Sequence, residues 1–344
     1  MTGRRRNLTL ITIGVALFLI YLVLTNPFSA FSMVRFDPVL YTLAVAVDYL
    51  GLFLFVASWY IILRILGVEI GLIEATQVTF TSIFVGWIVP IPLNTEIARA
   101  YLIRGKRNSN MAKAVASVLV HRAYYNIAFG VIIASTALYI LFLNHSPIPI
   151  SLEVVTFLLL FAVVSSLVFS LVLSPRFLKT VYDRSPGWMK RSILPRLIGR
   201  ENVGEGFIGF VGDLESVRSK LMSRPGVNLL AFVLVAIHWG LGAVTTYLVA
   251  ISMGVKLEIW VAVFMYAVVE FIQQLNWVIP SGFGVVDAGL TGAFVLTGLP
   301  LSLASALSLL TRFATNWVEL ILFAPVAFSY GYRELLRARP RVPS

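Results

Sequence analysis

The stretch "WIVPIPLNTEIARAYLIRG", residues 87–105, interrupts a long apolar run with two prolines, a glutamate and two arginines. The chain around it has 344 residues, of which 59% are hydrophobic and 12% are charged. Soluble domains carry about 25% charged residues, so this composition is typical of an integral membrane protein. Charged and irregular segments at membrane depth are tolerated only inside the protein or against a water-filled cavity. The stretch therefore predicts a polar cavity within a membrane domain.

Composition also excludes several classes of site. The chain has no cysteine, which excludes disulfides, iron–sulfur clusters and thiolate metal sites. Its three histidines lack metal-binding spacing, so we expect neither a metal site nor a cofactor. The net charge is +11, but the basic residues lie between apolar segments, where they orient a membrane protein and attract anionic lipid head groups. No nucleic-acid-binding module accompanies them, so we expect membrane lipids, anionic or phosphate-bearing, as partners rather than nucleic acid.

Apolar runs long enough to cross a bilayer recur along the whole chain. We therefore expect an all-α polytopic membrane protein that forms a single integral membrane domain over 1–344, with a retained first helix. Between 175 and 225 lies a polar stretch with ten Lys or Arg against five Asp or Glu, which predicts amphipathic helices at the cytoplasmic surface. The apolar segments lie at about 8–25, 38–63, 70–89, 111–143, 151–174, 226–250, 257–279 and 300–330, with shorter pieces at about 94–104 and 284–298.

Loop charges predict how these segments cross the membrane, because basic loops lie in the cytoplasm. If all eight long segments crossed fully, the basic loop 104–113 and the basic stretch 175–225 would lie outside. If 70–104 and 257–298 are instead re-entrant helical hairpins, every basic cluster is cytoplasmic, and so are both termini. We therefore expect a multi-pass protein of the cell membrane, with about six full spans plus two re-entrant hairpins.

Two halves of the chain, about 38–143 and 226–330, repeat one pattern at an offset of 190 residues. The matches are "WIVP" (87–90) with "WVIP" (277–280), and "HRAYYN" (121–126) with "TRFATN" (311–316). Since the hairpins enter from opposite sides, the halves form an inverted repeat. Such repeats are typical of transporters, whose substrate site lies near the midplane where the broken helices meet.

Both hairpins are expected to turn at prolines and glycines, since proline ends a helix and glycine allows the chain to reverse. Asn94 or Thr95 is expected to cap the returning helix, whose N-terminal amides would face an anion. The second hairpin carries polar side chains on its incoming arm, which predicts that this arm lines a cavity. The expected tip residues are Pro90, Pro92, Asn94, Pro280, Gly282 and Gly284, and the expected cavity residues are Glu270, Gln273 and Gln274.

Intramembrane arginines have two interpretations in this chain. They could form structural salt bridges, Arg122 with Glu96 and Arg312 with Asp287 or Glu319. They could equally bind a phosphate head group, which the planar guanidinium grips with two hydrogen bonds. Glu96 could also be satisfied by a residue three positions later on the same arm, Arg99. The residues expected along the substrate path are Glu96, Arg99, Arg122, Asn126, Asp287, Arg312, Asn316 and Glu319, the last three on one helix face at i, i+4 and i+7.

Two further polar residues at membrane depth are weighed in the same way. Asp48, in the middle of its segment, is either a proton-coupling carboxylate or a buried acid with a partner. His238 is expected to be interfacial.

These motifs resemble the flippase-like family found as the membrane region of lysylphosphatidylglycerol synthases. The resemblance lies in "PLNTEIARAYLIRG", "SVLVHRAYYNI" and "PSGFGVVDAGLTGAFVLTGLP" followed by "LLTRF". It implies movement of lipid between leaflets and, without an aminoacyltransferase domain, no synthesis of the aminoacylated lipid. The chain departs from the family pattern at Asn94 and Thr95, where glycines are usual, at Asp287, where glutamate is more common, and at His121, where an acid often precedes the arginine.

The leading hypothesis is a lipid flippase that moves a phospholipid or lipid-linked phosphate precursor through a charged groove at the hairpins. No nucleotide-binding motif is present, so a gradient, a proton or passive equilibration would drive movement. We expect no enzyme activity. The alternatives are an intramembrane transferase or hydrolase acting on a phospho-lipid, with Glu96, Asp287 or His121 as acid or base, and a small-anion transporter. A homo-oligomer is compatible with the sequence.

Overall fold

The computed structural model describes residues 3–32, 34–89, 93–143, 152–172, 174–187, 203–275 and 279–337, and every regular element within them is a helix. The predicted segments are confirmed as helices, with ends that differ by a few residues. The helices are α1 (Gly3–Thr25), η1 (Pro27–Ser32), α2 (Pro38–Ile65), α3 (Leu72–Ile88), α4 (Asn94–Ile103), α5 (Met111–Leu143), α6 (Leu152–Val172), α7 (Pro175–Arg184), α10 (Val203–Met222), α11 (Pro225–Ser252), α12 (Ile259–Leu275), η2 (Pro280–Gly282), α13 (Val285–Leu296), α14 (Leu301–Arg312), η3 (Phe313–Trp317) and α15 (Val318–Arg337).

Four stretches of the described chain are long and apolar enough to cross a membrane, judged by length and composition. The fold is therefore that of an all-helical membrane protein. Several other apolar helices are shorter, among them α3 and α12. The four stretches are Pro38–Ile65, Met111–Thr136, Pro225–Ser252 and Leu301–Gly331.

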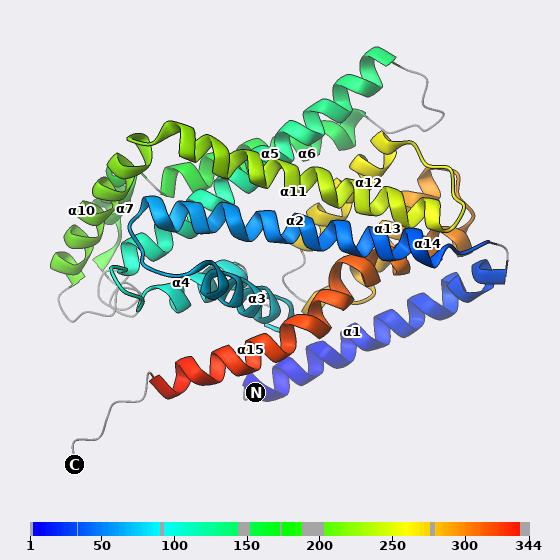
Figure 1. Ribbon diagram of the computed structural model, residues 1–344, viewed down its shortest axis with the longest axis horizontal. Helices are drawn as coiled ribbons and strands as arrows, with labels where there is room; N and C mark the ends of the chain where they lie inside the picture. The colour runs from blue at the N-terminus through cyan, green and yellow to red at the C-terminus, as the bar shows by residue number, and fades with distance from the viewer. Residues whose placement is uncertain are drawn as a thin grey trace.

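The centre of the fold is the antiparallel pair α2 and α11, which run side by side along the molecule (Figure 1). Their direction follows from contacts at both ends. The amide of Asp37, before α2, donates to the carbonyl of Ser252 at the end of α11 (2.7 Å). Farther along, the Ser58 hydroxyl donates to the carbonyl of Ala231 (2.7 Å). Small side chains allow the close approach, since a Cβ at Gly51 would lie 3.3 Å from the His238 ring.

Two helical hairpins pack against this central pair. In the first, α3 and α4 run antiparallel: Glu74 and Lys106 form an ion pair near the open end (2.9 Å), whereas Thr95 packs on Gly86 at the tip. In the second, α13 returns along α12, and Gly289 packs on Ile272. The hairpins follow α2 and α11 through short loops. Since those two helices are antiparallel, the hairpins open toward opposite ends of the molecule.

The hairpin tips meet in the interior. The Ser281 hydroxyl of the second tip donates to the carbonyl of Trp87 at the first (3.3 Å). Ser281, Gly282 and Gly284 all have positive φ, so the second tip does reverse through glycines. The first tip passes through Leu93, which has a φ of 56°. The expected tip residues at 90–92 lie outside the described residues.

Asn94 does not cap the returning helix as expected. The residue at the cap is Leu93, which has no side chain that could accept a hydrogen bond. The Asn94 side chain points back instead, and its amide donates to the carbonyls of Gly86 and Val89 at the end of α3. Because helix ends leave carbonyls unsatisfied, Asn94 closes the incoming arm of the hairpin, while its side-chain oxygen accepts a hydrogen bond from the Thr95 amide of the returning arm (2.7 Å).

The last long segment is interrupted. A π-helical turn, Phe313–Trp317, separates α14 from α15. Such a turn adds one residue to a helical turn, so the face of α15 lags that of α14 by about 100°. The turn therefore changes which side chains of this segment point together.

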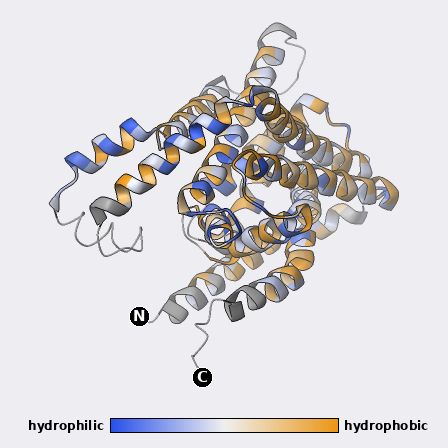
Figure 2. Ribbon diagram, turned by 60° about the vertical axis from the view of Figure 1, so that its left-hand side comes forward, coloured by the Kyte–Doolittle hydropathy of each residue, from blue (hydrophilic) through white to orange (hydrophobic). Residues whose placement is uncertain are grey.

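The outside of the molecule is apolar and the polar groups lie within. Figure 2 shows hydrophobic residues along the long helices. On α6, large apolar side chains are half exposed, as suits a surface that faces lipid; they include Phe157, Leu160, Val163, Val164, Leu167 and Val168.

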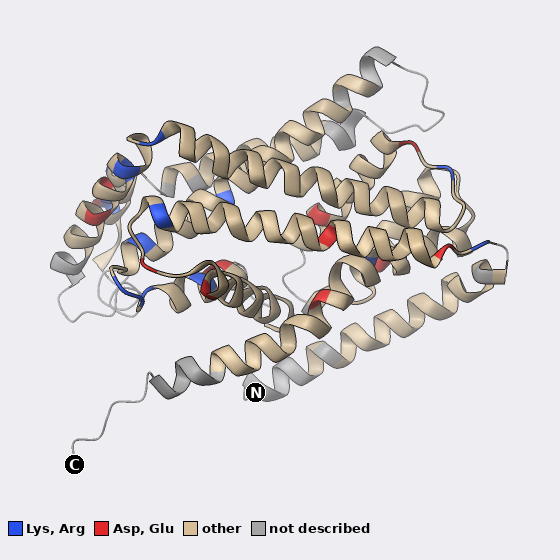
Figure 3. Ribbon diagram, viewed as in Figure 1, with Lys and Arg blue, Asp and Glu red and all other residues tan. Residues whose placement is uncertain are grey.

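Basic residues gather at one end of the molecule, around α10 and the loop between α4 and α5 (Figure 3). The amphipathic pieces α7 and α10 pack together there through stacked rings of Tyr182 and Phe207, 4.2 Å apart. Asp213 of α10 accepts a hydrogen bond from Asn110 (2.9 Å). The predicted amphipathic segment 175–225 is thus helical where it is described. Exposed basic residues at this end include Arg64, Arg104, Arg107, Arg176, Lys179, Arg184, Arg218, Lys220 and Arg224.

The second hairpin tip depends on glycine at 284. Its φ is 76°, and a Cβ there would lie 2.8 Å from the backbone of Leu17 and Phe18 in α1. We predict that Gly284→Ala lowers the midpoint of thermal unfolding in detergent. Gly298→Ala is the control, because Gly298 has a φ of 88° with nothing within 4 Å of a Cβ. Both variants carry roughly 1–2 kcal/mol of backbone strain, and only Gly284→Ala adds the clash. Equal losses would contradict this packing.

Candidate functional site

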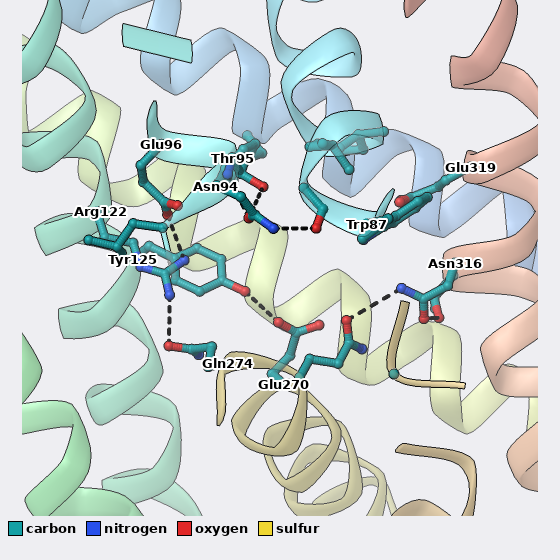
Figure 4. A pocket seen from close by; sticks show the side chains of 18 of the residues that line it. Trp87, Asn94, Thr95, Glu96, Arg122, Tyr125, Glu270, Gln274, Asn316 and Glu319 are labelled. Atoms are coloured by element: carbon teal, nitrogen blue, oxygen red, sulfur yellow. Dashed lines mark hydrogen bonds and ion pairs between the residues drawn. The ribbon is translucent and has the colours of Figure 1, made fainter. Parts of the chain in front are cut away.

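A cavity of about 440 Å³ lies where the two hairpin tips meet. Its wall combines both hairpins with α2, α5, α6, α11, η3 and α15. Figure 4 places Glu96, Arg122 and Tyr125 on one side of it, and Asn316 and Glu319 on the other. Charged and polar side chains thus lie in an interior that apolar helix surfaces surround. The charged or titratable residues with side chains in the wall include Asp48, Glu96, Arg99, His121, Arg122, His238, Glu270 and Glu319.

Arg122 joins the first hairpin to the second. One guanidinium nitrogen pairs with Glu96 of α4 (3.2 Å), and another donates to the Gln274 side chain of α12 (2.8 Å). Its guanidinium lies 5.1 Å from the Tyr125 ring. The Tyr125 hydroxyl in turn donates to Glu270 (2.6 Å). The expected pair of Arg122 with Glu96 is present, at the cavity wall (Figure 4).

Arg312 occupies the equivalent place in the second half, but it is sealed from the cavity. Its side chain is 1% exposed and that of its partner Asp287 is 0% exposed, at 3.3 Å. Arg312 also donates to the carbonyl of Ser281 (2.6 Å) and to the side chain of Asn316 (2.8 Å). Asn316 reaches the cavity and donates to Gln273 (3.4 Å). Arg312 therefore fastens the second tip to the last long segment.

Glu319 does not share the face of Arg312, contrary to the expected i, i+7 pattern. The π-helical turn between them rotates Glu319 into the cavity wall that Asp48 of α2 also lines, where the two acids interact electrostatically. Arg312 accordingly pairs with Asp287 rather than with Glu319. The partner of the buried Asp48 is a second acid.

Asp287 also caps the helix that starts at the second tip. Its second carboxylate oxygen accepts a hydrogen bond from the amide of Gly284 at the start of α13 (3.0 Å). A carboxylate in the first turn satisfies the orphan amides and the helix dipole. The N-terminus of α13 is thus capped by its own side chain, which excludes it as a free anion site.

Arg99 is the least compensated cation of the described residues in the wall. Of the two partners considered for Glu96, the ion pair is formed with Arg122 and not with Arg99. Arg99 shares a hydrogen bond with His121 Nδ1 (3.2 Å) and lies 4.8 Å from the Trp59 ring. It is 3% exposed, its Nε has no partner, and no carboxylate among the described residues lies within ion-pair distance. A buried guanidinium in this state favours an anionic ligand.

Two other wall residues have unsatisfied polar atoms. His121 Nε2 and both side-chain amide atoms of Asn126 are buried without a hydrogen-bond partner among the described residues. Both residues are 1% exposed. Buried polar groups normally have partners, so unpaired ones in a cavity wall indicate a bound molecule or water. Asn126 was predicted from its place one turn after Arg122, whereas His121 was noted only as a possible acid or base.

The sequence predicted an interfacial position for His238. The structure places it in the cavity wall instead. It falls at the middle of α11 and its ring centroid is 5.1 Å from that of Phe55. His238 is the fourteenth residue of the 28 in α11, counted from Pro225. Its position in the sequence therefore already indicated the middle of a span. Of the other expected residues that the structure describes, Glu270, Gln273, Gln274, Asn94 and Gly282 line the cavity, whereas Gly284 is not among its lining residues.

Comparison with known proteins gives a consistent family. The family described as "Lysylphosphatidylglycerol synthase TM region" matches residues 9–322. The chain is 21% identical to a UPF0104 membrane protein of Pyrococcus horikoshii, over 91% of this chain and 94% of that protein. It is 19% identical to a UPF0104 membrane protein of Methanothermobacter thermautotrophicus, over 92% and 93% of the two chains. No solved structure matches the chain significantly.

The two arginines should differ in their effect on stability. We predict that Arg312→Gln lowers the stability by about 3–5 kcal/mol, because it leaves Asp287 buried without a cation. Arg122→Gln should cost less, since the Arg122 side chain is 22% exposed to the cavity and the Glu96 carboxylate can be hydrated there. Thermal unfolding in detergent measures both. The double variant Asp287→Asn, Arg312→Gln should recover part of the loss, and the absence of any recovery would contradict the pairing.

Proposed function

Because the chain belongs to the family of the lysylphosphatidylglycerol synthase transmembrane region, we propose that it moves a phospholipid or lipid-linked phosphate precursor between the two leaflets. The observation that carries the proposal is a highly charged cavity at the meeting point of two hairpins, inside an apolar exterior. A lipid would place its head group in this cavity while its tails stay in the bilayer. The polar path lowers the cost of carrying a head group through the hydrocarbon.

The head-group phosphate would bind at Arg99. Arg122 and Arg312 each have a carboxylate partner, so their charges are already balanced. Arg99 has none within ion-pair distance among the described residues, and His121 and Asn126 beside it in the wall offer unpaired nitrogen atoms. Phosphate is a doubly ligating partner for a guanidinium and accepts hydrogen bonds from an imidazole or amide N–H. These contacts support an anionic head group.

The topology would be that of about six full spans and two re-entrant hairpins in the cell membrane. α4 has 10 residues, which at 1.5 Å per residue reach about 15 Å, half of a bilayer core. A helix of that length returns from the midplane and cannot cross. The basic end around α10 would be cytoplasmic, together with both termini.

Alternating access would come from the two hairpins. They open toward opposite ends and touch at their tips, through Ser281 and Trp87. Separation of the tips on one side at a time would expose the cavity to each leaflet in turn. On this proposal the protein changes the position of the lipid and no covalent bond, and it acts as a transporter rather than an enzyme.

We predict that the wild-type protein exchanges a fluorescent phosphatidylglycerol between leaflets of phosphatidylcholine vesicles faster than empty vesicles do. Arg99→Gln should slow exchange roughly 10- to 100-fold, the equivalent of about 1.5–3 kcal/mol for lost hydrogen bonds to a charged group. Arg99→Lys keeps the positive charge but lacks the planar guanidinium, so its exchange rate should lie between those of the wild type and Arg99→Gln. Quenching from outside the vesicle measures the fraction exchanged.

Arg104→Gln is the matched control, because Arg104 lies at the end of the same helix, exposed and stacked on Tyr101 at 3.9 Å. It should exchange lipid at the wild-type rate. No exchange by any form, together with a new lipid product, would replace the proposal with an intramembrane transferase or hydrolase. Transport of inorganic phosphate without lipid exchange would replace it with a small-anion transporter.

Cysteine labelling tests the topology, since the chain has no cysteine of its own. We predict that single cysteines at Gly71 and Arg104, on either side of the first hairpin, react with an impermeant reagent from the cytoplasmic face. Cysteines at Lys256 and Leu296, on either side of the second, should react from the opposite face. All four positions are exposed. Labelling of 71 and 104 from different faces would disprove the re-entrant hairpin.

A further inference from the structure

The charges in the cavity wall do not balance. Four carboxyl groups line it, those of Asp48, Glu96, Glu270 and Glu319, against two guanidinium groups. One of these acids, Glu96, is neutralised by Arg122. Among the described residues, none of the other three forms an ion pair.

Glu270 differs from the other two acids. It accepts a short hydrogen bond from the Tyr125 hydroxyl (2.6 Å), and it lies in the field of Arg122. Asp48 of α2 and Glu319 of α15 line the same cavity and interact with each other, and neither forms an ion pair among the described residues. Two carboxylates that share a site cannot both ionise without strong repulsion, and a hydrogen bond between two carboxyl groups requires a proton on one of them.

Among the described residues, no cation forms an ion pair with either acid of this pair. The titratable groups that interact with it are Glu270 and Tyr266 of α12 and Tyr49 of α2, all of which are acids or phenols. His238 of α11 lines the same cavity. A proton on the pair is therefore the available means of reducing its negative charge.

A second feature of the cavity wall is a side chain with hydrogen-bonding atoms still available. Asn126 is 1% exposed and lines the same cavity, and both its amide atoms lack a partner among the described residues. It has a donor and an acceptor available to a bound molecule. An anionic head group that enters next to Asn126 meets a wall whose acids outnumber its bases, and a proton on the acid pair lowers that repulsion.

We propose that Asp48 and Glu319 bind one proton that travels with the anionic head group, so that lipid movement is coupled to a proton gradient. This inference rests on the proposed function. The pair takes the proton from water on one side, as an O–H bond shared between two carboxyl groups, and returns it to water on the other. One positive and one negative charge move together, so the cycle is electroneutral. The coupling is reciprocal. A bound proton raises the affinity for the anion, and a bound anion raises the affinity for the proton by the same factor.

The experiment uses the same vesicles and fluorescent phosphatidylglycerol, with the outside one pH unit more acidic than the inside. A single proton per lipid should concentrate the probe about tenfold in the inner leaflet, because one pH unit equals a tenfold ratio in equilibrium. The double variant Asp48→Asn, Glu319→Gln, which mimics a permanently neutral pair, should still exchange the probe but leave the leaflets equal. Glu215→Gln, at an exposed acid on α10, is the control and should concentrate the probe like the wild type.

Each other outcome has a definite meaning. Exchange by the wild type that leaves the leaflets equal under the gradient overturns the coupling and keeps the proposed function. A wild-type ratio in the double variant overturns the role of this pair. Absence of exchange in every form overturns the proposed function. Infrared spectroscopy of the protein in lipid at neutral pH then tests separately whether the acid pair holds a proton. Loss of a protonated-carboxyl band in the double variant supports the site, and an unchanged band overturns it.

Discussion

The fold depends on ion pairs between a hairpin and a helix in surroundings that cannot solvate charge. Arg122 with Glu96, and Arg312 with Asp287, each fasten one helical hairpin to a longer helix. An arginine at membrane depth is costly without a partner, so each pair fixes the depth and angle of its hairpin. The hairpins in turn bring their tips together and enclose the cavity. Removal of one partner therefore changes the wall of the cavity as well as the stability.

The two halves use this interaction differently, although their sequences match. Glu96 lies in the wall, where its pair with Arg122 faces the cavity, whereas Asp287 is fully buried and also caps α13. Water in the cavity can stabilise the first pair when it opens, but the second pair has no such substitute. The two hairpins are thus held by pairs that differ in their access to water.

Much of this arrangement could be predicted from sequence. Length and apolar content are local properties, so the helices were predicted to within a few residues, and the offset of 190 residues identified Arg122 and Arg312 as equivalent positions. The contacts that escaped prediction depend on how distant helices pack. Arg99 meets His121 only because α4 lies against α5, and His238 reaches the cavity because α11 packs on Gly51 of α2. Asp48 and Glu319 come together through the π-helical turn, and no residue pattern in the sequence predicted that turn.

That turn makes the chemistry of the cavity sensitive to chain length rather than to residue type. The extra residue within Phe313–Trp317 directs Glu319 away from Arg312 and toward Asp48. Deletion of a single residue there would restore a regular α-helix and return positions seven apart to one face. Glu319 would then turn toward the side of Arg312, and Asp48 would lose its acidic partner. A relative that is one residue shorter in this turn would keep every charged side chain and yet lack the acid pair.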